Sequence, residues 1–217
     1  MDRRHPLAKN PIFLSIIIFL CIIIIYYYSI IYNLYNLERI SINNFETGDV
    51  IFMIDNHLLK GELAKFIICN LLYSFCTTLY THVGVVFKRD SDLFIITAEA
   101  NGKCLRVQRL SHLLNNYTGN FICFKNKKKL YDSDKRVHEF LNLNKNVQYH
   151  FNPLSFVKIV FGLNGNFPKN KTICTKNAIE LLRHLGINLN IDPNSTEVRL
   201  LYNAISNSNY YSGPYLV

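Results

Sequence analysis

The first feature of the hydrophobic pattern is an unbroken apolar run near the N-terminus. No charged residue occurs between Ile12 and Tyr32, and about 21 helical residues at a rise of 1.5 Å each span roughly 32 Å, close to the thickness of a bilayer's hydrocarbon core. Pro11 suits the first position of such a helix. The pattern therefore predicts a transmembrane helix over residues 11–33, preceded by a basic flank at residues 1–10.

The sequence leaves the membrane topology open. A cleaved signal peptide is the alternative to an anchor, but the run is too long and no small-residue cleavage site follows it. Arg3, Arg4 and Lys9 precede the run, and the positive-inside rule then favours a cytosolic N-terminus, with the domain on the far side of the membrane. The cysteines show no paired spacing, as in reduced proteins, at positions 21, 69, 76, 104, 123 and 174. Sequons at Asn116, Asn170 and Asn194 favour a lumenal domain instead.

Beyond a linker at residues 34–47, shorter apolar runs alternate between a period of two and a period near 3.6. Strands are predicted at residues 48–54, 81–87, 92–99, 103–107 and 119–125. Helices are predicted at residues 59–75, 133–142, 173–185 and 195–205. No internal repeat or low-complexity segment interrupts this part, so one α+β domain is expected at residues 48–217.

The strand predicted for THVGVVF carries a histidine in an otherwise apolar run. Side chains alternate along a strand, so His82 and Gly84 share one face. The polar stretch RDSD suits a four-residue hairpin loop, which pairs Lys88 with Leu93. The same register puts His82 opposite Glu99, with Cβ atoms about 5 Å apart. Such a carboxylate fixes the imidazole tautomer and stabilises its cation, and Gly84 is expected to leave room for another group to approach this face.

The segment KTICTKNAIELLRHLGI supplies that group. It predicts an amphipathic helix that ends at Gly186, and Cys174, four residues before Ala178, continues the buried stripe into the first turn. The helix dipole and an adjacent imidazolium are expected to lower the pKa of this thiol, and the N–H groups of the turn are placed to hold an oxyanion. Cys174, His82 and Glu99 therefore have the residue types of a thiol hydrolase.

Each of these residues also has a structural interpretation. Cys174 can be a small buried apolar residue, His82 a satisfied core group and Glu99 the solvated end of a strand. Cys76 is the alternative nucleophile, although it falls in an expected helix-to-strand connection. No CxxC, HxxxH or HxxE spacing supports a zinc site, and no metal or cofactor is expected.

The order of four short segments resembles that in a known superfamily. GDVIF, THVGVVF and ITAEANG precede a cysteine that opens a C-terminal helix. This order resembles the circularly permuted branch of the papain-like NlpC-type superfamily over about residues 46–186. The branch includes bacterial YiiX-like proteins, lecithin:retinol acyltransferase and a poxvirus protein family. The resemblance implies a permuted papain-like fold, with a small antiparallel sheet packed against helices.

The resemblance also implies roles for the candidate residues. Cys174 would be the nucleophile, His82 the general base and Glu99 the polar third member of a Cys-His-Glu triad. The Gly-Asp pair of GDVIF would begin the core sheet and have a structural role. Lys176 and Asn177 depart from the small or acidic residues that many relatives carry after the cysteine, which bears on the substrate.

The implied activity is that of a cysteine hydrolase or acyltransferase acting on an amide or ester bond. Its substrates would be peptide, isopeptide or lipid-acyl compounds, and its partners the membrane, through the N-terminal helix, and a peptide or lipid-linked substrate. The Asn-, Ile-, Lys- and Tyr-rich composition favours the poxvirus family, and hence a host or virion membrane. The alternative is a membrane-tethered binding or virion structural protein with the same fold and no turnover.

Composition adds two limits. With 49% hydrophobic residues the chain is not disordered. The net charge of +9 includes a dense patch at Lys125–Lys129, but no recognised nucleic-acid-binding motif accompanies it, so a solvated basic face is expected and no nucleic-acid partner. The sequence does not predict an oligomeric state.

Overall fold

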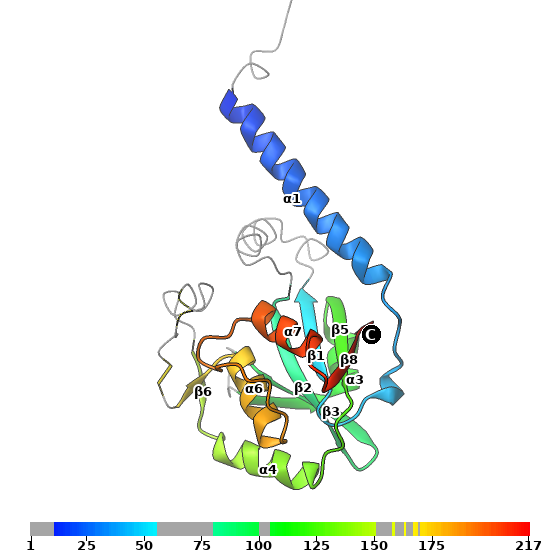
Figure 1. Cartoon of the computed structure of the whole chain (residues 1–217), viewed down its shortest axis with the longest axis vertical. Coiled ribbons are helices and arrows are strands. Elements are labelled where there is room, and N and C mark those ends of the chain that lie inside the picture. Colours follow the sequence, from blue (N-terminus) through cyan, green and yellow to red (C-terminus); the bar gives the residue numbers. More distant parts are fainter. Residues whose placement is uncertain are drawn as a thin grey trace, which may run out of the picture. The chain divides into compact units, whose positions relative to one another are not determined.

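A computed structural model describes residues 11–55, 80–99, 105–150, 158, 163, 167–168 and 170–217. The chain divides into two compact units, Met1–Leu37 and Glu38–Val217. Most of the described part of the first unit is helix α1 (Pro11–Tyr35) (Figure 1). Within the described part of the chain, no helix combines the length and the apolar character that crossing a bilayer demands. The anchor expected over residues 11–33 stays a prediction.

The second unit is built on an antiparallel sheet of six strands in the order β4-β3-β2-β1-β5-β8. The strands are β1 (Val50–Asp55), β2 (His82–Arg89), β3 (Asp92–Ala98), β4 (Leu105–Arg109), β5 (Gly119–Asn126) and β8 (Tyr211–Leu216). The helices of this unit are η2 (Ile42–Asn44), α3 (Leu110–Asn116), α4 (Ser133–Leu143), α6 (Cys174–His184) and α7 (Val198–Ser206). A separate parallel pair joins β6 (Gln148–Tyr149) to β7 (Lys171–Thr172).

This mixed α+β architecture, with an antiparallel sheet packed against helices, confirms the predicted class. Every strand and helix expected within the described residues is present, with ends shifted by about three residues or fewer. The helix expected at residues 59–75 lies outside the described residues. The sequence pattern does not predict α3 or β8.

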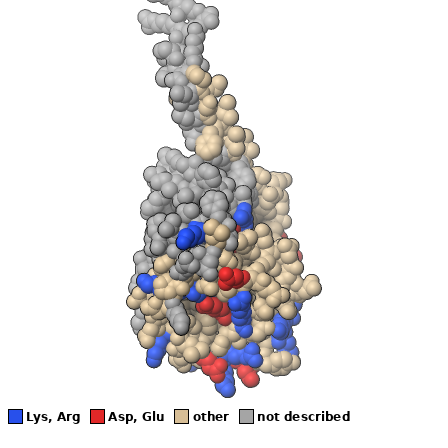
Figure 2. Space-filling model, turned by 60° about the vertical axis from the view of Figure 1, so that its left-hand side comes forward, with Lys and Arg blue, Asp and Glu red and all other residues tan. Residues whose placement is uncertain are grey.

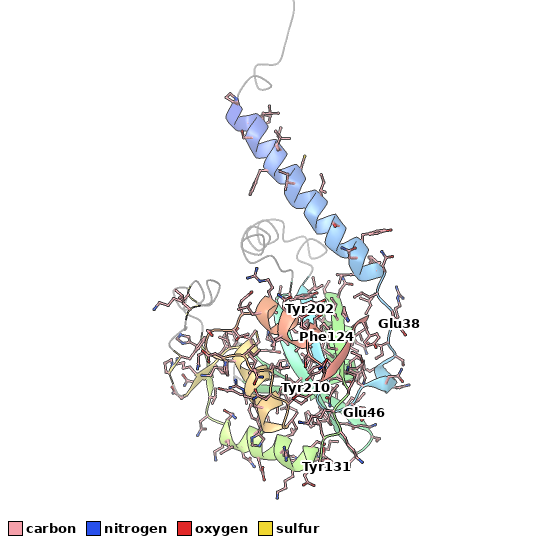
Figure 3. The ribbon with its side chains drawn as sticks, viewed as in Figure 1. Glu38, Glu46, Phe124, Tyr131, Tyr202 and Tyr210 are labelled. Carbon is pink, nitrogen blue, oxygen red and sulfur yellow. The ribbon has the colours of Figure 1, made fainter. Side chains whose placement is uncertain are left out.

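Helices cover both faces of the sheet. On one face, Ile51 and Met53 of β1 belong to a buried cluster that includes Leu110 and Leu113 of α3. Phe52, between them in the strand, points to the other face and packs 5.4 Å, centroid to centroid, from Tyr202 of α7. Tyr202 also packs against Phe124 of β5, and the two rings lie close together in Figure 3. Helix α6 contacts α4 and α7 as well as β2 and β3, so it lies on the α7 side.

The β2–β3 hairpin has the predicted register but a shorter loop. Lys88 pairs with Leu93 as expected, and Arg89 also pairs with Asp92. The loop is therefore the two-residue turn Asp90-Ser91, and the prediction of a four-residue loop is wrong. Asp90 adopts a left-handed conformation with φ of 55°, which Asp tolerates in tight turns. Because the two extra residues pair with each other, the register of the remaining strand is unchanged.

The Gly-Asp turn before β1 has the expected structural role. Gly48 adopts a φ of 91°, a conformation that favours glycine. The carboxylate of Asp49 is fully buried and accepts hydrogen bonds from the N–H groups of Glu46 and Asn126, each at 2.8 Å. The ammonium of Lys125 pairs with the same carboxylate. These contacts tie the start of β1 to the end of β5.

Candidate active site

His82 is the first residue of β2 and pairs with Met53 of β1. The β2–β3 register pairs Gly84 with Thr97, and its continuation by two residues along each strand places His82 opposite Glu99, which follows β3. The predicted register of β2 and β3 is thus confirmed over the pairs that the two strands form, from Gly84–Thr97 to Lys88–Leu93. The negative charge of Glu99 acts on His82 and favours the imidazolium, although burial has the larger effect and lowers the His82 pKa.

Two neighbours hold the Glu99 carboxylate. Thr97 Oγ1 donates to Oε1 at 3.1 Å, and Arg106 Nη1 of β4 donates to Oε2 at 2.9 Å. Thr97 pairs with Arg106 across β3 and β4, so the three side chains share the face on which His82 lies. Sequence reasoning missed the arginine, although aligning the expected strand at 103–107 with its neighbour would have brought it to Glu99. Glu99 is therefore oriented for an electrostatic role beside the imidazole.

The face above Gly84 is not open. A Cβ atom built at this glycine would lie 2.7 Å from Cγ1 of Ile95 and 2.8 Å from Cγ2 of Thr97. The three nearest atoms belong to these two side chains of β3 and not to α6. The expectation that Gly84 admits the cysteine-bearing helix onto the His82 face is wrong. The missing side chain instead lets large neighbours on β3 fill the cluster under α3.

Cys174 reaches β2 from the other face. It is the first residue of α6, and its side chain is buried in the stripe that Ala178 and Leu181 continue. The N–H of Val83, directly after His82, donates a hydrogen bond to Sγ, as do the N–H groups of Thr175 and of Cys174 itself. The Val83 N–H is a site component that the sequence does not reveal. The Val83 N–H places the thiol at the N-terminal end of β2, where His82 is the first residue.

The far end of α6 matches its prediction. Gly186 has a φ of 90°, the N–H of Ile187 donates to the Leu182 carbonyl at 2.8 Å, and the N–H of Gly186 donates to the Arg183 carbonyl at 2.9 Å. This pattern closes the helix with a glycine in the left-handed region, as the sequence indicates.

The prediction of a lowered pKa for the Cys174 thiol is wrong, because the thiol is buried. Burial raises the pKa of Cys174 to about 11, although the three N–H donors act to lower it. A thiolate in a site that is 6% exposed loses most of its hydration, and this cost exceeds the gain from the helix terminus. Burial likewise lowers the pKa of His82, so at neutral pH the resting pair is a neutral thiol and a neutral imidazole.

A cavity of about 510 Å³ opens beside His82 and Glu99 on the α3 side. Nε2 of His82 and Nε2 of Gln108 are buried beside it, and neither has a hydrogen-bond partner among the described residues. Buried polar atoms are normally paired, so these two nitrogens are available to a ligand. The described residues that line this cavity do not include Cys174, and sequence reasoning did not select Gln108.

Of the remaining candidates, Cys76, the alternative nucleophile, lies outside the described residues. The described part of the chain contains no cluster of three or more His, Cys, Asp and Glu side chains suited to a metal ion. On the face shown in Figure 2, basic and acidic side chains are interspersed between uncharged ones.

Comparison with known proteins adds little. No protein-family model matches the sequence, and no curated protein matches it. Among solved structures, the chain is similar to the crystal structure of the metalloprotein YiiX from Escherichia coli O157:H7, with a TM-score of 0.46 and 12% identity, over 80% of this chain and 88% of that one. A likeness of this size does not assign an activity. Membership of the poxvirus family stays a prediction.

Proposed function

We propose that the chain is a cysteine hydrolase or acyltransferase that acts on an amide or ester bond through Cys174, His82 and Glu99. The observation that carries the proposal is the position of Cys174, which is buried at the first residue of α6 where this helix packs on β2; the Val83 N–H, next to the buried His82, acts on its thiol. The permuted papain-like fold implied by the order of the motifs belongs to the same proposal.

The resting state is electrically neutral, so His82 acts as a general base and not as half of a preformed ion pair. It takes the thiol proton as the sulfur attacks the substrate carbonyl. The N–H groups of Val83 and Thr175 stabilise the thiolate, and Glu99, held by Arg106, stabilises the imidazolium. His82 then gives the proton to the leaving amine or alcohol, and a thioester forms on Cys174.

The thioester is resolved by water in a hydrolase or by another acceptor in an acyltransferase. In the first case the carboxylic acid and the free thiol are released. The cavity beside His82 offers a place for part of a substrate, because the two unpaired nitrogens, on His82 and Gln108, suit a compound with carbonyl or N–H groups. Peptide, isopeptide and lipid-acyl substrates all have these groups.

Membrane anchoring through α1 is part of the same proposal. Its described side chains include exposed apolar ones, among them Phe13, Ile18 and Ile25, at 42%, 51% and 68% exposure. With no charged residue from Ile12 to Tyr32, such a surface suits lipid better than water. The proposed site of action is a host or virion membrane. A mobility shift of the full chain on glycosidase treatment would place the second unit in the lumen, and an unshifted band would favour the cytosolic side.

The raised pKa of Cys174 favours a second candidate. A protonated thiol is a poor nucleophile, so the chain can instead be a membrane-tethered binding or virion structural protein with the same fold. Its cavity would then hold a ligand without turnover.

An acyloxymethyl ketone probe with an alkyne tag separates the two candidates. The full chain, Cys174→Ala, Cys76→Ala and His82→Asn are treated at neutral pH, and the labelled residue is located by mass spectrometry. The enzyme proposal predicts labelling of Cys174 in the full chain and in Cys76→Ala, with loss in the other two variants. Equal labelling of all four proteins, or none in the unaltered chain, supports the binding protein.

A further inference from the structure

A second cavity, of about 360 Å³, lies between α4 and α6 beside β7. One side is apolar and is formed by Phe140, Leu143 and Val147, and the other carries Lys171, Lys176, Glu180 and His184. None of its described lining residues lines the cavity beside His82. The cavity therefore needs an explanation that does not depend on the candidate active site.

Lys176 is the unusual residue of this cavity, because it is a lysine with only 8% of its surface exposed. An ammonium group has three N–H donors and is costly to bury without acceptors. Among the described residues, Nζ donates to the carbonyl of Lys171 at 3.3 Å, and it lies 3.9 Å from Oε1 of Glu180, beyond hydrogen-bond length. Its remaining contact is with the ring of Phe167, at 5.2 Å. The described contacts thus use one donor of the three.

His184 gives a second, independent indication of a ligand. Its Nε2 atom is buried and has no hydrogen-bond partner among the described residues. Oε2 of Glu139 lies 3.7 Å from it, which is too far for a hydrogen bond. Two nitrogen groups that line one cavity therefore have unused hydrogen-bonding capacity.

The charges of the cavity select the ligand. Lys171 and Lys176 contribute two positive charges and Glu180 at most one negative charge, so the described lining is positive, and the carboxylate of Glu139 lies outside it, beside His184. The two lysines also act on the nearby His150 and, after burial, which has the larger effect, lower its pKa. A dianion such as phosphate would be repelled by the Glu180 carboxylate. A monoanion balances the single excess positive charge of the lining. The apolar side suits a short hydrocarbon chain.

We propose that this cavity binds a small organic monocarboxylate, with its carboxylate at Lys176 and Lys171 and its hydrocarbon chain against Phe140, Leu143 and Val147. The site is distinct from the candidate active site and does not rest on the proposed activity.

Titration of the detergent-solubilised full chain with hexanoate, followed by ligand-observed NMR, tests the proposal. We expect saturable binding that weakens at least about tenfold in Lys171→Met and Lys176→Met, since each variant loses one charge-assisted contact. Lys135→Met is the matched control, because Lys135 is an exposed lysine of α4, with 77% side-chain exposure, and does not line the cavity. Lys171→Met keeps the experiment informative if the buried Lys176→Met variant does not fold.

Three ligands of different charge complete the test. Hexanol, hexylammonium and inorganic phosphate are each expected to bind at least about tenfold more weakly than hexanoate. The proposal is overturned if hexanoate does not saturate, if it binds equally to the folded lysine variants and to Lys135→Met, or if phosphate or hexanol binds as well as hexanoate. None of these outcomes depends on thiol reactivity, so failure here is distinct from failure of the proposed activity.

Discussion

Replacing Lys125 by methionine should destabilise the protein strongly and in a pH-dependent way. The change removes the ammonium that pairs with the buried carboxylate of Asp49 and keeps most of the side-chain volume. Lys125 also donates to the Asn44 carbonyl and lies 5.4 Å from the centroid of the Phe45 ring. After the change, the donors left to Asp49 among the described residues are the N–H groups of Glu46 and Asn126.

The expected magnitude follows from these contacts. Breaking a buried ion pair by removing one partner costs about 3–5 kcal/mol. The two remaining N–H donors still stabilise the Asp49 carboxylate, so we expect a loss of about 3 kcal/mol in the free energy of unfolding at pH 7. This is a large part of the roughly 5–15 kcal/mol by which small domains are stable.

The pH dependence has a definite sign. Burial raises the pKa of Asp49, and Lys125 is the largest of the influences that lower it. The Lys125→Met variant therefore has a higher folded-state pKa for Asp49, while the unfolded value stays at about 3.9. Between these two values the folded state binds more protons than the unfolded state, so stability rises as the pH falls. The difference between variant and unaltered protein should shrink from pH 7 toward pH 4.

Urea unfolding followed by tyrosine fluorescence measures this effect, because the chain has 14 Tyr and no Trp. Lys127→Met is the matched control, since Lys127 is exposed and, within the described part of the chain, bonds through its backbone N–H alone, to the Tyr210 carbonyl. The double variant Asp49→Asn/Lys125→Met should lose less stability than Lys125→Met, because no unpaired charge is left buried. The reasoning is refuted if Lys125→Met unfolds like Lys127→Met, or if its loss of stability is the same at pH 7 and pH 4.5.

Three other predictions concern single residues. Gly84→Ala should lower the free energy of unfolding by about 1–2 kcal/mol, because its Cβ would lie 2.7 Å from Ile95 and 2.8 Å from Thr97; unchanged urea unfolding would contradict the packing described. Gly186→Ala should cost about 1 kcal/mol in the same assay, because the φ of 90° is unfavourable for alanine, and an increase in stability would count against this. Alkylation of Cys174 by iodoacetamide should be slow at pH 7 and rise toward pH 11, since burial raises the pKa of the thiol to about 11; a plateau by pH 8, in mass-spectrometric readout, would show an ordinary exposed thiol.

The hairpin shows why the register was predictable when the loop length was not. Side-chain alternation and the polar tip of the hairpin fix which residues face each other, and this relation holds whether two or four residues form the turn. Arg89 and Asp92 could therefore pair with each other without moving His82 relative to Glu99. Because the register does not depend on the loop length, the sequence could predict that Glu99 lies beside His82.

The sequence could not predict which face of the sheet α6 covers. An amphipathic stripe shows that a helix packs on a sheet, but both faces of this sheet are apolar. The glycine that suggested an open face is covered by Ile95 and Thr97, whose side chains lean across from the neighbouring strand. Long-range packing, not local pattern, decides this point.

The acidity of the thiol depends on burial, which a sequence does not specify. A position in the first turn of a helix predicts a lowered pKa for Cys174, and the hydrogen bonds from three N–H groups act in that direction. The depth of the site reverses the result, because an ion loses its hydration there. Degree of burial is a property of the assembled core.

Strand β8 was missed because its sequence, YSGPYL, contains glycine and proline. Both residues disfavour a central strand, but proline is tolerated where one side of a strand has no partner. β8 lies at the edge of the sheet next to β5, which makes the sequence compatible with a strand. Only the strand order reveals this position.

The central claim is that His82 activates the Cys174 thiol. The direct test is the rate at which the acyloxymethyl ketone probe labels Cys174 from pH 5 to pH 10, in the unaltered chain and in His82→Asn. The proposed mechanism predicts labelling at pH 7 that falls about 100-fold or more in the variant, with the difference narrowing at high pH as hydroxide removes the thiol proton. Equal labelling rates in the two proteins at pH 7 would contradict it.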